Sequence, residues 1–475
     1  MFESESRYKN QIVIKGYNKD VTGSTIKCTV ERSFLKKFSI LVDYGFYQGS
    51  EYEELSYNDS VIPSKIDAVF LTHNHLDHSG ALPILAKNGY KNKVYTSIPT
   101  AELLDIAFED TLSIFAEQAR DKKSKKKMLY NSGDVHKLKK LIKPVVYQKT
   151  IRLEDNLTAI LFENQHLVGA SMVLLRSNVY QGNEVNVLFT GDYNNKNSFL
   201  PVADLPEWLY KLKNLTIVIE STYGNTDSTD IKPVWEDNII NACKDNKSIL
   251  LLAFAQGRFQ EFLYQVKVLQ EKGIIPNDYM ILADGKTGIK YSLNYAQNKK
   301  LGIKSEMRKF FPDNLIFVNN KSRMNLLHFG NKKIIISTSG MGNFGPARTY
   351  IPEFLPDKNS IIHFGGYTAE DTVGRKLQEL EDGEPLSISG ITISKRATVY
   401  NTSQFSSHAK ADELISFINK FHDVKSVLVT HGEMDTKKVF AKRIVKESSV
   451  KKVGILGNGY SYRIGPYGII KSIQD

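Results

Sequence analysis

Short apolar runs rich in β-branched residues recur along the chain, and several of them end at an acidic residue or a histidine. Runs of this length and composition predict buried strands. The residues that end them are Asp43, His73, Asp192, Glu220 and His431. Because strands that share a sheet bring their ends together along one edge, we expect these side chains to form a common site.

Helical patterns lie between the predicted strands, as in residues 101–119 and 257–273. Strands mixed with helices throughout predict an α/β fold. A chain of 475 residues exceeds the ~100–200 residues of a usual domain, so we expect two lobes. A long interval without site residues separates Glu220 from His408, as an inserted domain would produce.

The charge of the chain is strongly basic, with a formal net charge of +11 and a pI near 9.1. This balance favours a polyanionic partner such as nucleic acid, although a lysine-rich solvated surface explains it almost as well. The densest basic stretches are residues 121–127 and 136–143. We interpret them as a flexible loop and a solvated helix face.

Cys28 and Cys243 lie far apart and near no metal-spaced partner, so we expect both to be reduced and buried. No apolar run approaches the ~18 residues that suggest a membrane span. The first residues are charged and lack the apolar segment of a secretory signal. We therefore expect a cytoplasmic protein with no membrane partner.

The segment HNHLDH places three histidines and an aspartate directly after a predicted strand. Imidazole nitrogen and carboxylate oxygen suit zinc, and a catalytic zinc site leaves a position for water. The spacing allows His73 and His75 to face one metal while Asp77 and His78 face a second. Grouping these side chains without a metal would cost desolvation or charge repulsion, so we interpret the segment as metal-binding.

Two metals need further ligands, and His166, Asp192 and His431 are the candidates, each in a loop after an apolar segment. Taken singly, such residues are more typical of a packing histidine or of an aspartate that caps a turn. The need to complete a site at HNHLDH favours their role as ligands.

Several motifs together resemble the β-CASP branch of the metallo-β-lactamase fold, specifically ribonucleases similar to the cleavage and polyadenylation specificity factor endonuclease. The motifs are DVTGSTIKC, HNHLDHSGALP, GDYN, ESTYG, LLAFAQGRFQEFLY, STSGMGNFGPA, GYTAEDTVGRKL, FSSHAKADEL and VTHGEMD. The resemblance covers nearly the whole chain. It implies a metallo-β-lactamase αβ/βα sandwich formed by residues 1–213 and 404–475, with an α/β β-CASP domain inserted at residues 214–403.

The resemblance also implies a centre of two zinc ions. The implied ligands are His73, His75 and His166 for one zinc, Asp77, His78 and His431 for the other, and Asp192 as the bridge. Three departures from the family pattern concern loop shape: Gln165 replaces a usual glycine, DYG replaces a more common cysteine-containing form, and EDTVGR replaces EGTLGR.

Asp43 would, by the same resemblance, orient the metal loop and the metal-bound water. Glu220, His408 and His431 stand at the three β-CASP motif positions. His408, just before an amphipathic helical pattern, would protonate the leaving oxygen, and Glu220 would hydrogen-bond its imidazole. The alternative for His408 is a residue that merely caps or packs at a helix start.

The glycine-rich turn SGMGNFG could offer backbone N–H groups of Ser339, Gly340 and Gly345 to a phosphate, or could be an ordinary tight turn. The resemblance favours contact with RNA. Arg258 and Arg375, each near a glycine at a predicted helix start, are further RNA-binding candidates, with a surface salt bridge as the alternative.

The remaining histidines are His136, His328, His363 and His422. We interpret them as structural and keep only His363 as a candidate for a functional role.

The implied function is zinc-dependent hydrolysis of RNA phosphodiester bonds, endonucleolytic, 5′-exonucleolytic or both, leaving a 5′-phosphate and a 3′-hydroxyl. A DNA-processing β-CASP nuclease is one alternative, but that branch typically carries valine where His431 stands. A small-molecule hydrolase of the wider fold would lack the insertion and His408. A non-cleaving RNA-binding scaffold would have lost ligands. RNA is the expected partner, with a homodimer and RNA-processing proteins as further candidates.

Overall fold

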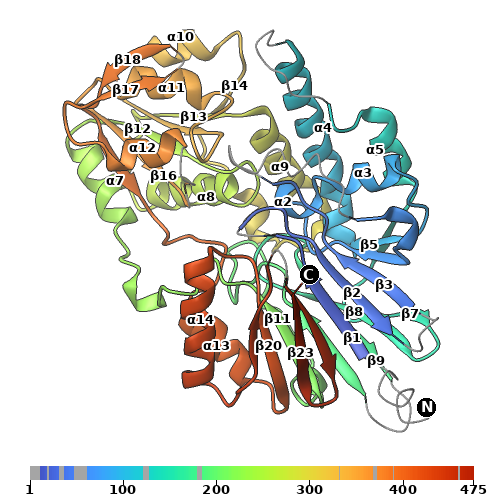
Figure 1. Ribbon diagram of the computed structural model, residues 1–475. Coiled ribbons are helices and arrows are strands. Elements are labelled where there is room, and N and C mark those ends of the chain that lie inside the picture. Colours follow the sequence, from blue (N-terminus) through green and yellow to red (C-terminus); the bar gives the residue numbers. More distant parts are fainter. Residues whose placement is uncertain are drawn as a thin grey trace, which may run out of the picture. The chain divides into compact units, whose positions relative to one another are not determined.

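The chain divides into two compact units, each described here by itself (Figure 1). Unit 1 comprises Met1–Asp230 and His408–Asp475, and unit 2 comprises Ile231–Ser407. The computed structural model describes residues 11–18, 21–31, 37–47, 61–120, 128–178, 184–330, 332–366, 368, 372–388, 390–457 and 460–474. The basic stretch at residues 121–127 lies outside these ranges.

The first sheet of unit 1 has the order β23-β22-β1-β2-β3-β4-β5-β6. Its strands are β1 (Gln11–Gly16), β2 (Ile26–Glu31), β3 (Lys37–Val42), β4 (Ala68–Phe70), β5 (Val94–Ser97), β6 (Ile142–Val145), β22 (Tyr460–Gly465) and β23 (Gly468–Gln474). Pairing is antiparallel from β23 to β3 and parallel from β3 to β6.

The second sheet of unit 1 has the order β21-β20-β11-β10-β9-β8-β7. Its strands are β7 (Thr150–Glu154), β8 (Leu157–Glu163), β9 (Ser171–Ser177), β10 (Val185–Phe189), β11 (Leu215–Ile219), β20 (Val424–Val429) and β21 (Val453–Ile455). Because β11 pairs with both β10 and β20, residues 214–230 group with unit 1, whereas the sequence analysis placed them in the inserted domain.

The two sheets of unit 1 share one apolar core. Side chains such as Ile14 and Val42 from the first sheet and Val187 and Phe189 from the second meet in it. Helices cover the two outer faces: α3 (Leu82–Lys87), α4 (Ile98–Arg120) and α5 (Ser132–Lys139) on the first sheet, and α13 (Ala411–Asn419) and α14 (Met434–Glu447) on the second. The predicted αβ/βα sandwich is therefore confirmed.

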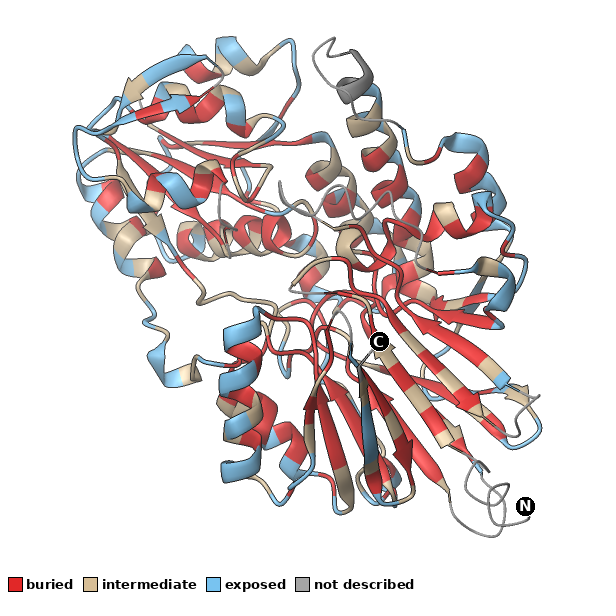
Figure 2. Ribbon diagram, viewed as in Figure 1, coloured by how far each residue is buried: buried red, intermediate tan, exposed pale blue. Residues whose placement is uncertain are grey.

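Burial along the strands follows from this layering. Every residue of β10 and β11 is buried, because one face meets the other sheet and the other face meets helices. In β1, buried and half-buried positions alternate with the two-residue period of a strand. Figure 2 shows the same contrast as continuous red on some strands and alternating red and tan on others.

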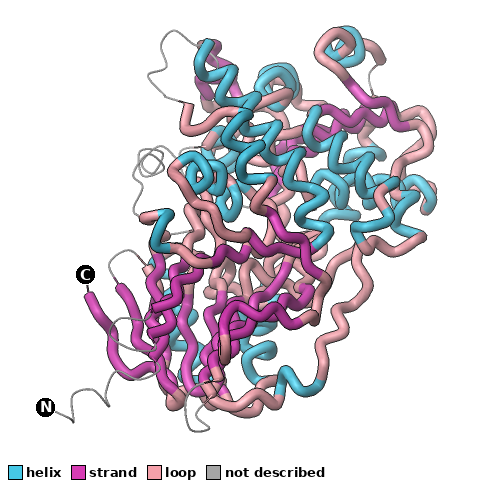
Figure 3. Tube along the Cα trace, turned by 90° about the vertical axis from the view of Figure 1, so that its right-hand side faces the viewer, coloured by secondary structure: helices cyan, strands magenta, loops and turns pink. Residues whose placement is uncertain are grey.

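Unit 2 is a parallel sheet with helices on both faces (Figure 3). Its order is β14-β13-β15-β12-β16-β19, formed by β12 (Ser248–Leu252), β13 (Met280–Asp284), β14 (Leu315–Val318), β15 (Lys333–Ser337), β16 (Ser360–Phe364) and β19 (Thr398–Asn401). Its helices are α7 (Trp235–Lys244), α8 (Arg258–Glu271), α9 (Lys286–Gln297), α10 (Arg323–His328), α11 (Ala347–Phe354) and α12 (Val373–Glu379). A hairpin of β17 (Pro385–Ile388) and β18 (Ile391–Ser394) completes the unit. The predicted inserted α/β domain is thus observed.

Shorter helices lie in the connections: α2 (Leu76–Ser79), α6 (Glu207–Tyr210), and the 3₁₀ turns η2 (Pro63–Lys65), η4 (Ser228–Asp230), η5 (Lys299–Leu301) and η6 (Glu306–Lys309).

Several local predictions are confirmed. The helical patterns at residues 101–119 and 257–273 correspond to α4 and α8. Cys28 and Cys243 are both free and buried. No helix among the described residues is long and apolar enough to cross a membrane.

The segment after β3 docks directly on the histidine-rich loop after β4. Tyr44 N–H donates to the carbonyl of His78 over 2.8 Å, and Phe46 N–H donates to that of Leu76 over 2.9 Å. Gly45 lies between these two bonds, where a Cβ atom would be 1.6 Å from the carbonyl oxygen of Asp77. The glycine of the DYG sequence is therefore required for close backbone contact.

Gly45→Ala should destabilise the protein, because one of the two backbone segments must move away from the other. Overpacking of this kind costs about 1–3 kcal/mol. Gly457→Ala is the matched control, since the nearest described atom to its Cβ, Cε of Met434, is 3.8 Å away. Chemical denaturation measures the free energy of unfolding of both variants. Equal values for the two would contradict the docking described here.

Candidate metal centre

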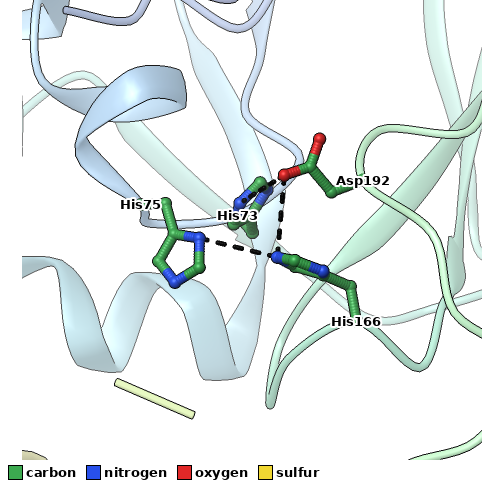
Figure 4. Close-up of side chains that lie close together, drawn as sticks. All are labelled: His73, His75, His166 and Asp192. Carbon is green, nitrogen blue, oxygen red and sulfur yellow. Dashed lines mark hydrogen bonds and ion pairs between the residues drawn. The ribbon is translucent and has the colours of Figure 1, made fainter. Parts of the chain in front are cut away.

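Histidine and acidic side chains from separate loops of unit 1 gather into three groups that share Asp192, and the third of these consists of Asp192, Glu220 and His408. The first consists of His73, His75, His166 and Asp192 (Figure 4). His166 Nε2 lies 3.5 Å from His75 Nδ1 and 3.7 Å from Asp192 Oδ2. His73 Nε2 lies 3.6 Å from the same carboxylate oxygen.

The second group consists of Asp77, His78, Asp192 and His431. His78 Nε2 lies 3.3 Å from His431 Nε2 and 3.7 Å from Asp77 Oδ2. It also lies 3.3 Å from Asp192 Oδ1. Asp192 therefore belongs to both groups and turns one carboxylate oxygen toward each.

These spacings fit metal coordination. Ligand atoms about 2.0–2.1 Å from one tetrahedral ion lie about 3.4 Å from one another. Moreover, His73 Nε2 is buried and makes no hydrogen bond in the described structure, a costly state for a polar atom unless a cation satisfies it. The residues present could hold metal ions, and the structure brings together every ligand that the sequence analysis proposed.

Burial lowers the pKa values of two histidines in the first group. It lowers the pKa of His73 well below its usual range and lowers that of His75 to about 4. Both rings are therefore neutral near pH 7, which is the form that binds a metal. Burial disfavours the charge on Asp192, but the neighbouring histidines outweigh it and hold the pKa of this carboxyl well below its usual range.

In the second group, the surroundings of His78 favour its protonated form. Burial disfavours a charged His78, yet the carboxylates of Asp192 and Asp43 raise the pKa of His78 well above its usual range. A cation bound at His78 Nε2 would therefore have to displace a proton.

Asp43 fixes the orientation of the histidine-rich loop. One of its oxygens accepts hydrogen bonds from His78 Nδ1 over 2.7 Å and from the Thr72 hydroxyl over 2.8 Å, and the other accepts from Thr72 N–H over 2.7 Å. A proton held at Nδ1 leaves Nε2 of His78 free to face the centre, as in carboxylate–histidine–metal arrangements. The structure thus supports the loop-orienting role predicted for Asp43, while its role toward a water stays a prediction.

Asn164 is a supporting residue that the sequence analysis missed. Its amide donates to the carbonyls of Thr190 and Asp192 over 2.9 and 2.8 Å, and its side-chain oxygen accepts from His166 N–H over 3.1 Å. It therefore joins the loops that carry His166 and Asp192, although Gln165 replaces the usual glycine directly before His166. The only signal in the sequence was an asparagine in a turn, which is too common to single out.

The half-buried His408 and the buried Glu220 form a pair beside these two groups. His408 Nδ1 lies 2.9 Å from both Glu220 oxygens, and its Nε2 faces Asp192 Oδ2 at 4.0 Å. Glu220 also accepts from Tyr193 N–H over 2.6 Å, which holds the carboxylate in place. Burial opposes a charge on His408, but Glu220 outweighs it and raises the pKa of His408. The hydrogen bond predicted between these residues is confirmed.

The predicted RNA-binding residues of unit 2 lie on loops at the carboxyl ends of adjacent parallel strands. Gly340, after β15, approaches the backbone of Phe254, after β12, so closely that a Cβ would be 2.9 Å from its nitrogen. Gly345 has a positive φ of 61°. The turn also contacts the start of α12, where Gly374 N–H donates to the carbonyl of Met341 over 2.9 Å.

The two arginines of unit 2 differ. Arg258 is buried at the start of α8, with its guanidinium 5.8 Å from the ring centroid of Phe405. Arg375 makes the surface ion pair considered as its alternative, with Glu379 at 2.6 Å. RNA contact by either one stays a prediction.

His363, the remaining candidate histidine, is buried in unit 2 against the ring of Trp235, with centroids 5.2 Å apart. Burial lowers its pKa to about 4. These contacts indicate a packing role.

Comparison with known proteins agrees with the fold and the site. Residues 34–219 match the model of the metallo-beta-lactamase superfamily domain, residues 259–377 that of the Beta-Casp domain, and residues 392–453 that of the Zn-dependent metallo-hydrolase RNA specificity domain. The fold and the ligand groups define the class as a metallo-hydrolase.

Relatives come from archaea and a eukaryote. Probable RNase MJ4 of Methanocaldococcus jannaschii is 30% identical over 89% of this chain and 93% of its own length. Transcription termination factor FttA of Methanosarcina mazei is 28% identical over 83% of this chain, which spans 63% of the factor. The Integrator complex subunit 11 homolog of Dictyostelium discoideum is 26% identical over 93% of this chain and 59% of that protein. The chain belongs to the β-CASP branch of the metallo-β-lactamase family.

Proposed function

We propose that this chain is a zinc-dependent ribonuclease that hydrolyses RNA phosphodiester bonds with an activated water, leaving a 5′-phosphate and a 3′-hydroxyl. The observation that carries the proposal is the pair of ligand groups that share Asp192, one carboxylate oxygen facing each. RNA as the substrate is supported by the match to an RNA specificity domain and by the relative named as an RNase.

Two zinc ions, when bound, would stabilise negative charge on the phosphate and lower the pKa of water toward about 7. His73, His75 and His166 would hold one ion, and Asp77, His78 and His431 the other, with Asp192 shared. Asp43 and Asn164 keep these side chains oriented before substrate arrives. Such preorganisation matters because small displacements of reacting groups are costly.

His408 is the proposed proton donor. The ribose 3′-oxygen is a poor leaving group unless it is protonated as the bond to phosphorus breaks. Glu220 accepts a hydrogen bond from Nδ1–H of His408 and favours the imidazolium, so Nε2 can deliver its proton on the side that faces Asp192. The neutral imidazole then takes up a proton from water, and the Glu220 carboxylate again stabilises the imidazolium.

Contact with the RNA chain is proposed for the loops of unit 2. The N–H groups of Ser339, Gly340 and Gly345 would bind phosphate oxygens. Phe254 and Phe344 lie beside or within these loops and are 39% and 55% exposed. Exposed aromatic rings stack on bases of single-stranded RNA without strong sequence preference. The sequence analysis did not single out these two residues.

The chain should bind two zinc ions, because seven ligands are too many for one four-coordinate ion. His431→Ala should lose one of the two ions and most of the activity, since it removes a ligand of the second group. His422→Ala is the matched control, because His422 is exposed in the same unit. Elemental analysis of purified protein measures the metal content. A single zinc in active parent protein, or two in the His431 variant, would show the assignment wrong.

The products should carry a 5′-phosphate and a 3′-hydroxyl, because the nucleophile is water rather than the RNA 2′-hydroxyl. RNA labelled at either end, with a 5′ mono- or triphosphate, separates a ladder of fragments from released mononucleotides. A 2′-O-methyl group at the cleaved position should leave the chemistry available. Detection of a 2′,3′-cyclic phosphate would exclude this mechanism, and cleavage of DNA alone would exclude RNA as the substrate.

His408→Ala should keep both zinc ions and bind RNA, yet lose roughly 10²–10⁴-fold in rate, the usual contribution of a positioned general acid. Single-turnover cleavage with saturating enzyme measures the chemical step, and elemental analysis controls for metal loss. An active variant, or an inactive one that has lost zinc, would remove His408 from this role.

A further inference from the structure

The Lys410 side chain is buried next to the candidate centre, although lysine is among the residues least often buried. Lys410 is only 5% exposed. Its ammonium nitrogen lies 3.2 Å from the centroid of the Tyr223 ring. The negative face of an aromatic ring attracts a cation, and the attraction is stronger away from water. Each of the two side chains therefore restricts the position of the other.

Tyr223 in turn contacts His408. The two ring centroids are 6.3 Å apart, with an interplanar angle of 61°. Two other described rings contact the His408 imidazole: His166 at 4.6 Å and His431 at 6.0 Å. These two are candidate metal ligands and would be held by the ions. Tyr223 lies outside the ligand groups. Its ring is held instead by the contact with Lys410.

Hydrogen bonds of the backbone and of side chains join the chain segments that carry this pair. Ala411 N–H donates to the carbonyl of Thr226 over 2.9 Å. Ser228 donates to Asp412 through its N–H over 2.8 Å and through its hydroxyl. The segment after His408 is therefore tied to the segment after Glu220, and the Lys410–Tyr223 contact lies between these links and the imidazole.

We infer that Lys410 and Tyr223 are positioning residues for His408. The Lys410 ammonium holds the Tyr223 ring, and the ring limits how far the His408 imidazole can tilt from its bond to Glu220. Glu220 contacts the imidazole only at Nδ1, so packing of the Tyr223 ring supplies a second, separate restraint on the plane of the imidazole. The inference rests on the proposed function, because it assumes that the direction of His408 Nε2 matters for proton delivery.

Four variants of the full zinc-loaded chain test the inference. Lys410→Met removes the charge and keeps the length of the side chain. Tyr223→Leu removes the ring, and Tyr223→Phe keeps it. Lys420→Met is the matched control, because Lys420 is an exposed lysine at the other end of α13.

Lys410→Met and Tyr223→Leu should each lower kcat for RNA cleavage by roughly 10- to 100-fold, the cost of a small misplacement of a catalytic group. KM should change less than about twofold and the zinc content should stay that of the parent, because neither side chain is assigned to RNA or metal. Tyr223→Phe and Lys420→Met should retain the parent rate. The double variant of Lys410→Met and Tyr223→Leu should be no slower than the slower single variant, because both substitutions remove the same restraint on the His408 imidazole.

A second readout does not depend on cleavage. The imidazole Cε1–H resonance of His408, in protein labelled with ¹³C-histidine and assigned through His408→Ala, reports the ring current of Tyr223. It should shift in Lys410→Met toward its value in Tyr223→Leu, and stay unchanged in Lys420→Met. If the parent fails to cleave RNA, the proposed function is lost, whereas this resonance still tests the contact.

Parent values of both kcat and the resonance in Lys410→Met would overturn the inference. Single-variant losses that multiply in the double variant would also overturn it, because they would show that the two residues act separately.

Discussion

The buried carboxylate of Asp192 is the interaction on which the rest of the site depends. It lies where the two ligand groups meet, and each of its oxygens faces one group. An ionised carboxylate at a position 2% exposed is costly unless positive charge compensates it. The surrounding histidines supply part of that compensation, and bound cations would supply the remainder. A centre of this kind is stable only if every ligand arrives from a rigid element.

The sandwich of unit 1 meets that requirement through the ends of its strands. Asp43 and the histidine-rich loop follow β3 and β4 of the first sheet, while Asp192, Glu220 and His431 follow β10, β11 and β20 of the second. The strands themselves are almost wholly buried, so each loop that follows a strand begins at a fixed position. Polar residues such as Asn164 then tie one loop to the next.

Much of this arrangement was predictable because it depends on local patterns. An apolar run followed by one polar residue identified the positions of Asp43, Asp192 and Glu220, and the dense spacing of HNHLDH indicated metal binding by itself. The assignment of His166 as a ligand needed evidence beyond its local pattern, because a single histidine in a turn carries little information. The unit to which residues 214–230 belong could not be predicted from the sequence pattern. The apolar run of β11 is compatible with either unit, and only its pairing with β10 and β20 assigns it to unit 1. The burial of Lys410 could not be predicted for a related reason. A lysine before an amphipathic helix is usually solvated, and Tyr223, against which Lys410 is buried, lies nearly two hundred positions away in the sequence.

We propose that Asp192 bridges two metal ions. A crystal of the zinc-loaded protein, measured on both sides of the zinc absorption edge, would locate these ions. We expect two anomalous peaks about 3.5–4 Å apart, as in other two-metal sites, one among His73, His75 and His166 and one among Asp77, His78 and His431, with the Asp192 carboxylate between them. A single peak, or two peaks of which only one lies within bonding distance of Asp192, would contradict this proposal.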